Sequence, residues 1–167
     1  CRDRNVFINL DMESGGLHDI TMRVFEGLAL DEAFRDFPHM GMVLQAYLRD
    51  ARSIAERVIA LAEKRGTPFT VRLVKGAYWD FEVAHARQFG FECPVFTGKS
   101  DTDAEYERVT TMLLQHHTKL ATAFASHNIR SISHAIVQAD RLGVPANGFE
   151  IQMLHGAARP ERDAIRE

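Results

Sequence analysis

The 167-residue sequence predicts an α/β fold, and more specifically a partial (β/α)8 TIM-type barrel with about five parallel β/α units. Two observations support it. Short apolar runs alternate with longer segments whose apolar residues recur at helical spacing, which is typical of βαβ units and a parallel sheet. Polar residues collect where these runs end, the edge at which barrels build active sites. The competing architecture, a doubly wound sheet, lacks support because no run precedes Gly-x-Gly-x-x-Gly.

The elements follow from apolar patterning and from residues that stop helices. We predict strands at residues 6–10, 42–47, 69–74, 122–125 and 149–154. After the second strand, Ile54, Val58 and Leu61 form the apolar stripe of a helix that ends at Gly66. Further helices are predicted at residues 80–90, 100–114 and 129–139. No linker or internal repeat interrupts this order, so we expect residues 1–167 to form a single domain.

The composition is typical of a soluble globular protein. Apolar residues make up 46% of the chain, charged residues 26%, and the net charge of -3 argues against a nucleic-acid partner for this segment. No apolar run approaches the length of a bilayer span, and no signal peptide is visible. Two cysteines make no disulfide framework, so we expect a reducing, cytoplasmic setting. Because the chain does not begin with Met, we expect a piece of a longer protein.

Four polar residues in or just after the apolar runs are candidates for a site: Asp11, Gln45, Arg72 and Lys75. A buried arginine needs an anion or a strong acceptor, so Arg72 has to meet either Asp11 or a ligand with developing negative charge. A buried amide such as that of Gln45 has to tie a loop or hold a ligand. Asp11 is equally well explained as a helix cap or turn residue. The residues alone leave these alternatives open.

The histidines form no recognisable metal motif. His-Glu-x-x-His does not occur in the sequence. Asp11, His127 and His155 follow predicted strands and are the residues that a metal ion would use. Their wide separation makes the signal weak, so we predict no metal site.

Several long motifs, taken in order, resemble one family. They are "NLDMES" (9–14), "VLQAYLRD" (43–50), "RLVKGAYWD" (72–80), "FASHN" (124–128) and "FEIQMLHG" (149–156). Together they resemble the proline dehydrogenase barrel, and most closely its bacterial form in proteins of the proline utilization A type. The resemblance covers nearly the whole chain, and "RLVKGAYW" is long enough to be specific.

The resemblance implies a distorted barrel that holds FAD over the carboxyl ends of its strands. It implies oxidation of L-proline to Δ1-pyrroline-5-carboxylate, with hydride passing from proline C5 to flavin N5 and electrons then passing to a membrane quinone. We therefore expect a cytoplasmic protein, with peripheral contact to the inner membrane as one alternative. An aldehyde dehydrogenase domain in the same longer chain is a further partner that the resemblance suggests.

The resemblance also assigns roles residue by residue. Asp11 matches the acidic active-site residue, and Arg72 matches the arginine beside flavin N5. Leu73, Tyr78 and Leu154 match residues that line the proline site. The residues that match cofactor contacts are Gln45, Arg72, Val74, Lys75, Gly76, Ala77, Trp79, Phe96, Thr97, Ser126, His127, Asn128 and Gln152. Ser126 stands where the family usually has threonine, which is a mild departure.

Two features of the complete family barrel are absent from this sequence. One is an early-strand lysine that contacts the substrate carboxylate, and the other is a last helix with paired arginines that clamp it. No Arg-Arg pair occurs anywhere in the chain. The resemblance therefore implies a central fragment of the barrel, and we expect the isolated chain to be inactive.

Two alternatives to this function stay open. A strand-end lysine in an apolar setting can act as a Schiff-base nucleophile, so Lys75 could serve a lyase or aldolase built on a barrel. The chain could also be a truncated barrel segment that catalyses nothing.

Overall fold

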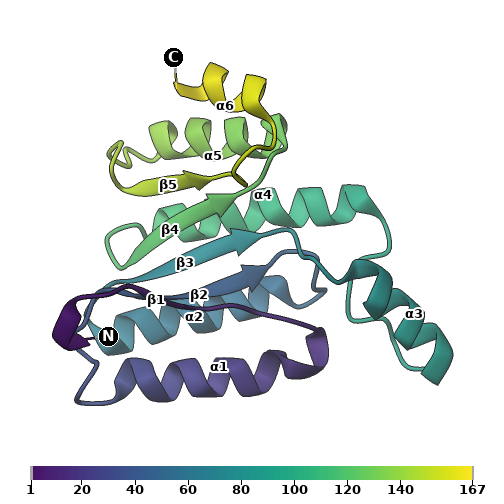
Figure 1. Ribbon diagram of the computed structural model, residues 1–167, viewed down its shortest axis with the longest axis horizontal. Coiled ribbons are helices and arrows are strands. Elements are labelled where there is room, and N and C mark those ends of the chain that lie inside the picture. Colours follow the sequence, from purple (N-terminus) through teal and green to yellow (C-terminus); the bar gives the residue numbers. More distant parts are fainter. Residues whose placement is uncertain (1, 167) are drawn as a thin grey trace.

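The computed structural model describes residues 2–166, and its elements alternate between strand and helix along most of the chain (Figure 1). The elements are η1 (Arg2–Arg4), β1 (Ile8–Leu10), α1 (Gly15–Leu30), β2 (Met40–Gln45), α2 (Ala51–Arg65), β3 (Phe69–Val74), α3 (Trp79–Phe89), α4 (Lys99–Gln115), β4 (Leu120–Ala125), α5 (Ile129–Arg141), β5 (Phe149–Gln152) and α6 (Arg159–Arg166). The predicted α/β class is confirmed.

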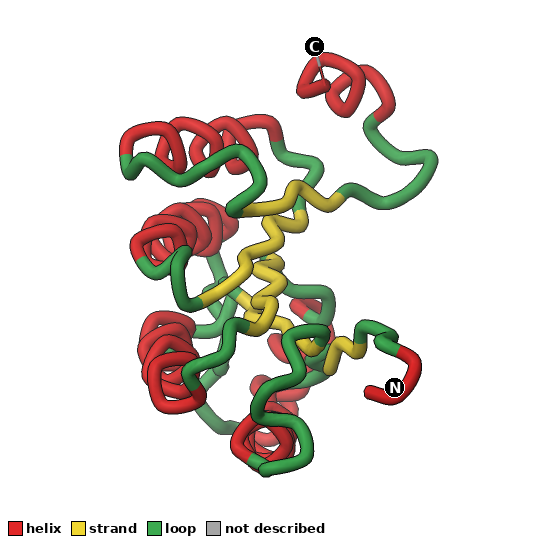
Figure 2. The backbone as a smooth tube through the Cα atoms, turned by 90° about the vertical axis from the view of Figure 1, so that its left-hand side faces the viewer, coloured by secondary structure: helices red, strands yellow, loops and turns green. Residues whose placement is uncertain are grey.

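All five strands are parallel, and they lie in the sheet in chain order, β1-β2-β3-β4-β5. A doubly wound sheet reverses this order at a switch point, and no reversal occurs within residues 2–166. Figure 2 shows helices following one another along one side of the strands, and α2 and α4 contact β2, β3 and β4. Sequential parallel strands with helices outside them are the features of a barrel wall.

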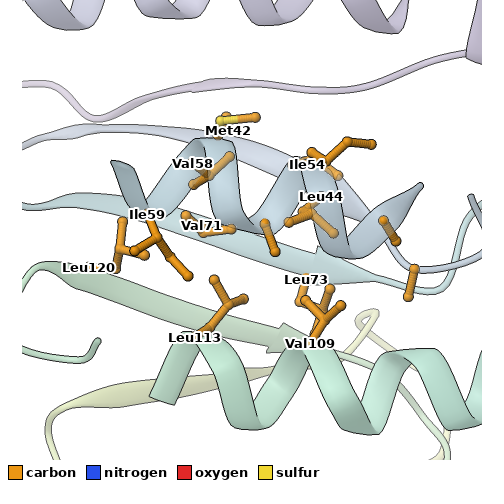
Figure 3. Packing of buried hydrophobic residues seen from close by; sticks show 14 of the residues in the cluster. Met42, Leu44, Ile54, Val58, Ile59, Val71, Leu73, Val109, Leu113 and Leu120 are labelled. Carbon is orange, nitrogen blue, oxygen red and sulfur yellow. The ribbon is translucent and has the colours of Figure 1, made fainter. Parts of the chain in front are cut away.

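Strand β3 shows how the sheet separates its two faces. Phe69, Val71 and Leu73 are fully buried, whereas the alternate side chains, including Arg72 and Val74, are half-buried. The buried set packs against the apolar stripes of α2 and α4 (Figure 3). Burying each such side chain stabilises the fold by about 1.5–3 kcal/mol. The face that carries Arg72 is therefore the inner face of the barrel wall, away from these helices.

Helix boundaries follow the stop and start signals in the sequence. Gly66 ends α2 in the left-handed conformation, with φ of 82°, and its N–H donates to the carbonyl of Ala62. At the start of α5, the side chain of Asn128 accepts from the backbone N–H of Ser131, which is a regular N-cap.

Some strand boundaries differ from the prediction. β2 begins at Met40 and ends at Gln45, two residues earlier than predicted at both ends. Pairing with β3 nevertheless continues past β2, because the N–H groups of Ala46 and Tyr47 donate to the carbonyls of Val74 and Lys75 at 2.8 and 2.7 Å. β1 starts later, β4 starts earlier and β5 ends earlier than predicted.

Helix α6 was missed because its sequence, RPERDAIR, offers almost no apolar stripe. Across residues 2–166, no helix combines the length and the apolar character that crossing a bilayer requires.

Candidate active site

The inner face of the sheet presents side chains in layers at its carboxyl edge. Gln45 pairs in register with Val74, and Ala125 pairs with Gln152, so these four side chains belong to the outermost layer. Arg72 lies one layer deeper, in register with residues of β2 and β4. Because parallel strands end together, residues far apart in sequence meet here.

A cavity of about 670 Å³ opens at this edge, which is a typical size for a small-molecule site. Its lining residues are Asp11, Met12, Val43, Gln45, Arg72, Val74, Lys75, Gly76, Ala77, Ala125, Ser126, His127, Gln152, Met153 and Leu154. The structure therefore brings together the strand-end polar residues that the sequence singled out. Four lining residues were not predicted, namely Met12, Val43, Ala125 and Met153, although strand alternation places Val43 on the same face as Gln45.

Arg72 and Asp11 form the central ion pair of the cavity. Arg72 Nη1 lies 2.9 Å from Asp11 Oδ1, and the side-chain amide of Asn9 donates to the same oxygen at 2.8 Å. The internal partner that the sequence suggested for Arg72 is therefore present. Arg72 Nε is buried and has no hydrogen-bond partner among residues 2–166. The guanidinium thus keeps a buried donor, Nε–H, that Asp11 does not use.

Gln45 also uses one end of its side chain and leaves the other free. Its side chain is almost completely buried, and Nε2 donates to the carbonyl of Glu13 at 3.1 Å. This bond ties the loop after β1 to the end of β2. Gln45 Oε1 is buried without a partner in the described part of the chain. Gln45 can therefore hold a loop and still offer an acceptor to a ligand.

Lys75 is held by an acidic partner on α4. Its Nζ lies 2.5 Å from Asp103 Oδ1 and 5.7 Å from the ring centroid of Tyr106. Burial acts to raise the pKa of Asp103, but hydrogen bonds from Lys75 and Lys99 outweigh it and hold that pKa below its ordinary value. A Schiff-base lysine reacts as the free amine. The ion pair with Asp103 would have to break first, so this geometry does not favour the lyase alternative.

Glycine is required at position 76 because the ring of Tyr47 leaves no room for a side chain there. Its φ is +132°, and a Cβ at this position would lie 2.4 Å from the ring of Tyr47. Tyr47 is 2% exposed, and its ring lies against Gly76. The ring of Tyr47 therefore excludes a side chain at position 76, and the contact of Gly76 with a cofactor stays a prediction.

A second cavity, of about 470 Å³, adjoins the first and shares Lys75 and Gly76 with it. Trp79 and Thr97 line this second cavity. The indole N–H of Trp79 donates to the carbonyl of Phe96 at 2.8 Å, which fixes the start of α3 against the loop before α4. Trp79, Phe96 and Thr97 are thus gathered beside the main cavity rather than inside it.

The segment after β4 contributes the imidazole ring of His127 and the helix-capping side chain of Asn128. His127 Nε2 accepts from the backbone N–H of Leu154 at 2.9 Å, which joins the ends of β4 and β5. Ser126 Oγ accepts from the N–H of Asn128 at 3.1 Å. The side chain of Asn128 caps α5 and does not line the cavity. Its contact with a cofactor stays a prediction.

Two predicted substrate contacts lie elsewhere. Leu73 is fully buried between β3 and α4, on the face opposite Arg72 (Figure 3). Strand alternation explains this position, since residues 72 and 73 must point to opposite faces. Tyr78, at the start of α3, is 39% exposed and lines neither cavity. Leu154, in contrast, lies at the cavity mouth.

Asp11, His127 and His155 do not come together as metal ligands. Within residues 2–166, no group of three or more His, Cys, Asp or Glu side chains is arranged to hold a metal ion.

Comparison with known proteins places this geometry in a family. The whole chain, residues 1–167, matches the family model described as proline dehydrogenase. Over 161 residues it is 32% identical to the bifunctional protein PutA of Escherichia coli (strain K12), covering 96% of this chain and 12% of that protein. The solved structure of PutA from Bdellovibrio bacteriovorus, inactivated by N-propargylglycine, superimposes with a TM-score of 0.96 at 42% identity. It covers 98% of this chain and 17% of that one.

PutA from Corynebacterium freiburgense gives a TM-score of 0.90 at 32% identity, over 96% of this chain and 17% of that structure. The chain therefore spans only 12–17% of the length of these relatives. Within that span, the sequential parallel strands agree with a family match over residues 1–167. The chain belongs to the proline dehydrogenase family.

Proposed function

We propose that this chain is the cofactor-facing central part of an enzyme that oxidises L-proline to Δ1-pyrroline-5-carboxylate. FAD is the immediate electron acceptor in this proposal, and a membrane quinone is the final one. The observation that carries the proposal is the convergence of Asp11, Gln45, Arg72 and Lys75 on one cavity at the carboxyl edge of the sheet. Family membership supports the reaction class.

Two buried atoms without partners fit a flavin ring. A flavin offers an imide N–H, together with ring nitrogens and carbonyl oxygens that accept hydrogen bonds. Among residues 2–166, Gln45 Oε1 is a free acceptor and Arg72 Nε is a free donor. Since unsatisfied buried polar atoms are costly, both favour a polar ligand in the cavity. When bound, FAD supplies a two-electron acceptor for the oxidation.

The remaining contacts would hold the cofactor from both sides. The end of β3, residues 74–77, and the polar residues Ser126, His127 and Gln152 line the same cavity. Trp79 and Thr97 line the adjoining cavity, which suits the part of FAD beyond the ring. Leu154, at the cavity mouth, offers an apolar wall to the proline ring.

Arg72 and Asp11 have the central chemical roles in this proposal. Oxidation removes a hydride from C5 of proline and a proton from its nitrogen. Arg72 is a permanent cation where negative charge develops, and such a preorganised charge stabilises the transition state. Asp11 orients the guanidinium through their 2.9 Å contact.

The longer protein provides the partners of this reaction in our proposal. Similar curated proteins are named bifunctional, which supports a second activity in the same chain. We propose an aldehyde dehydrogenase domain, which would consume the product after its ring opens. We also propose a cytoplasmic protein that reaches its quinone by peripheral contact with the inner membrane.

The test uses the full-length protein. Its absorption spectrum is recorded without oxygen before and after L-proline is added, with L-valine as the acyclic control. We expect a yellow protein whose flavin band bleaches with L-proline and not with L-valine, and recovers when a soluble quinone is added. A colourless protein, or a flavin band that L-proline leaves unchanged, would overturn the proposal. Borohydride trapping of a carbonyl substrate on Lys75 would instead support the lyase alternative.

A further inference from the structure

Asp11 lies on a loop, residues 11–14, that no strand holds. It follows β1, which is only three residues long, and precedes α1. Two hydrogen bonds anchor this loop near its far end. One is the bond from Gln45 Nε2 to the carbonyl of Glu13, and the other joins the N–H of Gly15 to the carboxylate of Glu82 at 2.5 Å.

Glu82 is an unusual residue for its position. It lies in the first turn of α3 and is only 3% exposed, on the same buried face as Val83 and Ala86. Glutamate is rarely buried to this extent unless a strong partner holds it. Burial and, after it, the charge of Glu82 raise the pKa of Tyr47 to about 12.

The N-terminus of α1 lacks a capping group of its own. Ser14 occupies the N-cap position, but its side chain makes no capping hydrogen bond, and the first turn of α1 contains no acidic residue. Helix N-termini leave several N–H groups without partners and favour a nearby anion. A Cβ at Gly15 would lie 3.5 Å from Glu82 Oε1, which is an ordinary van der Waals distance, so the carboxylate lies directly against the start of α1. Glu82 thus caps α1 from a helix 67 residues further along the chain.

We propose that Glu82 is a positioning residue for Asp11. By capping α1, it fixes the loop 11–14 and connects α3, which continues directly from the cavity-lining segment 74–77, to the residue that orients Arg72. Several contacts then act on the same segment: Arg72 and Asn9 hold the side chain of Asp11, Gln45 holds the carbonyl of Glu13, and Glu82 holds the N–H of Gly15, where the loop enters α1. This inference rests on the function proposed above.

The test compares three variants of the full-length protein. Glu82→Met keeps the length of the side chain but removes the acceptor, Glu82→Gln keeps a carbonyl acceptor, and Asp80→Asn is a matched control that removes an exposed acidic group from the same helical turn. Hydrogen exchange is followed in peptides that span residues 11–17. We expect exchange there to rise about tenfold in Glu82→Met, equivalent to about 1.4 kcal/mol, and to stay near the wild-type rate in Glu82→Gln and Asp80→Asn.

Kinetics separate positioning from general stability. We expect Glu82→Met to lower kcat for proline oxidation about tenfold with little change in KM, because a displaced catalytic group impairs the chemical step. In an Asp11→Asn background the same substitution should cost less than about twofold, since residues that act through one another are not additive. Equal losses in both backgrounds would overturn the proposal, as would unchanged exchange at residues 11–17.

A second variant removes the donor instead of the acceptor. Gly15→Pro deletes the N–H at the first helical position, where proline is well tolerated, and Ser14 already has the extended backbone that precedes proline, with φ of -67° and ψ of 156°. We expect Gly15→Pro to raise hydrogen exchange in residues 11–17 and to lower kcat, as predicted for Glu82→Met. It therefore tests the proposal also in the case that Glu82→Met does not fold. If the full-length protein oxidised no proline, the proposed function would fail, whereas the exchange data would still decide the role of Glu82.

Discussion

At the scale of single residues, the cavity is built from side chains that bond to one another with some atoms and leave others free. Arg72 uses Nη1 on Asp11 and leaves Nε, and Gln45 uses Nε2 on Glu13 and leaves Oε1. A purely structural network would satisfy all of these atoms within the protein. The free atoms of Arg72 and Gln45 are therefore available for hydrogen bonds to a ligand in the cavity.

We predict that Arg72→Ala in the full-length enzyme slows the reduction of flavin by proline about 100-fold, with a smaller change in KM. A fixed charge that acts on developing negative charge contributes mainly to the transition state, and losing such a contact typically costs about 10²–10³ in kcat. Stopped-flow absorbance of the flavin band measures this rate directly.

Two further variants sharpen that test. Arg72→Lys should recover only part of the rate, because a point charge does not replace a planar fork with several donors. Arg87→Ala, on the exposed face of α3, is the matched control and should behave as wild type. Normal flavin reduction in Arg72→Ala, with only a raised KM, would contradict the catalytic role of Arg72.

We predict that Gly76→Ala destabilises the sheet edge by roughly 2–4 kcal/mol, because it combines a strained positive φ with a steric overlap. The overlap is with the ring of Tyr47, 2.4 Å from the added Cβ. Gly27→Ala, in open space on the exposed side of α1, should be neutral or stabilise by about 0.5–1 kcal/mol. Hydrogen exchange of peptides spanning β2 and β3 compares the two. Equal protection in both variants would show that Tyr47 can move aside.

The sequence predicted which polar residues line the cavity better than it predicted their hydrogen-bond and ion-pair partners. The polar residues at strand ends could be identified because parallel strands finish at one edge. Strand alternation places Leu73 on the buried face, opposite Arg72. The resemblance to the family instead assigned Leu73 to the lining of the proline site. The partner of Lys75 could not be predicted, since Asp103 lies on α4, 28 residues further along the chain.

At the scale of elements, ion pairs join neighbouring helices around the outside of the sheet. Arg130 on α5 lies 2.7 Å from Glu107 on α4, and His134 on α5 contacts the Glu107 carbonyl at 3.0 Å. The hydrogen bond from Arg130 holds the pKa of Glu107 below its ordinary value of 4.5. This lowered pKa makes the junction of α4 and α5 sensitive to acid.

We predict that Glu107→Gln slightly lowers the stability of the α4–α5 region at pH 7, and that the difference disappears in acid. Because the folded-state pKa lies below 4.5, the contribution of Glu107 is complete above that pH and is lost as pH falls through the folded value. The urea midpoint of peptides from α4 and α5, measured by pulsed hydrogen exchange at pH 7 and pH 3, tests this.

Glu63→Gln, on the exposed side of α2, is the control for that experiment. Its midpoint should match wild type at both pH values, since surface carboxylates without close partners contribute little. A difference between Glu107→Gln and wild type that persisted unchanged at pH 3 would contradict the assigned cause.

Elements with a clear apolar pattern were predicted with nearly correct bounds. Elements without such a pattern were predicted with shifted bounds or not at all. The strand at 69–74 was found with its observed bounds because its alternation is clear. β2 is buried on both faces, so no alternation marks its ends and the prediction shifted by two residues. α6 has too few apolar residues to be recognised at all.

At the scale of the whole molecule, the described sheet is an open wall with two edges. β1 pairs only with β2, and β5 pairs only with β4, within residues 2–166. The polar inner face and these unpaired edges are the surfaces that a closed barrel would cover. Family and fold class could be inferred from sequence because the motifs are long, whereas the cavity depends on side-chain packing that motifs do not specify.

We predict that the 167-residue chain on its own oxidises no measurable proline, even with added FAD, and that it self-associates. The cationic residues expected to hold the proline carboxylate are absent, and losing such contacts costs about 2–5 kcal/mol each. Open strand edges favour pairing between copies. Dye reduction with proline and light scattering after size exclusion measure the two properties, with the full-length protein as reference. A monomeric chain that turned over proline at the full-length rate would refute both expectations.

The sequential strand order also has a kinetic consequence. Each strand hydrogen-bonds to the strand that precedes it in the chain, so the sheet can lengthen one β/α unit at a time and no early strand has to wait for a distant partner. Pairing with the preceding strand keeps the sequence separation of contacting residues shorter than a reversed strand order would, and shorter separations favour faster folding. Emerging from the ribosome, residues 8–74 already contain three neighbouring strands with two connecting helices. The hydrogen bonds that β3 makes with β2 can therefore form during synthesis, before α3 brings Glu82 to cap α1 and before α4 brings Asp103 to Lys75.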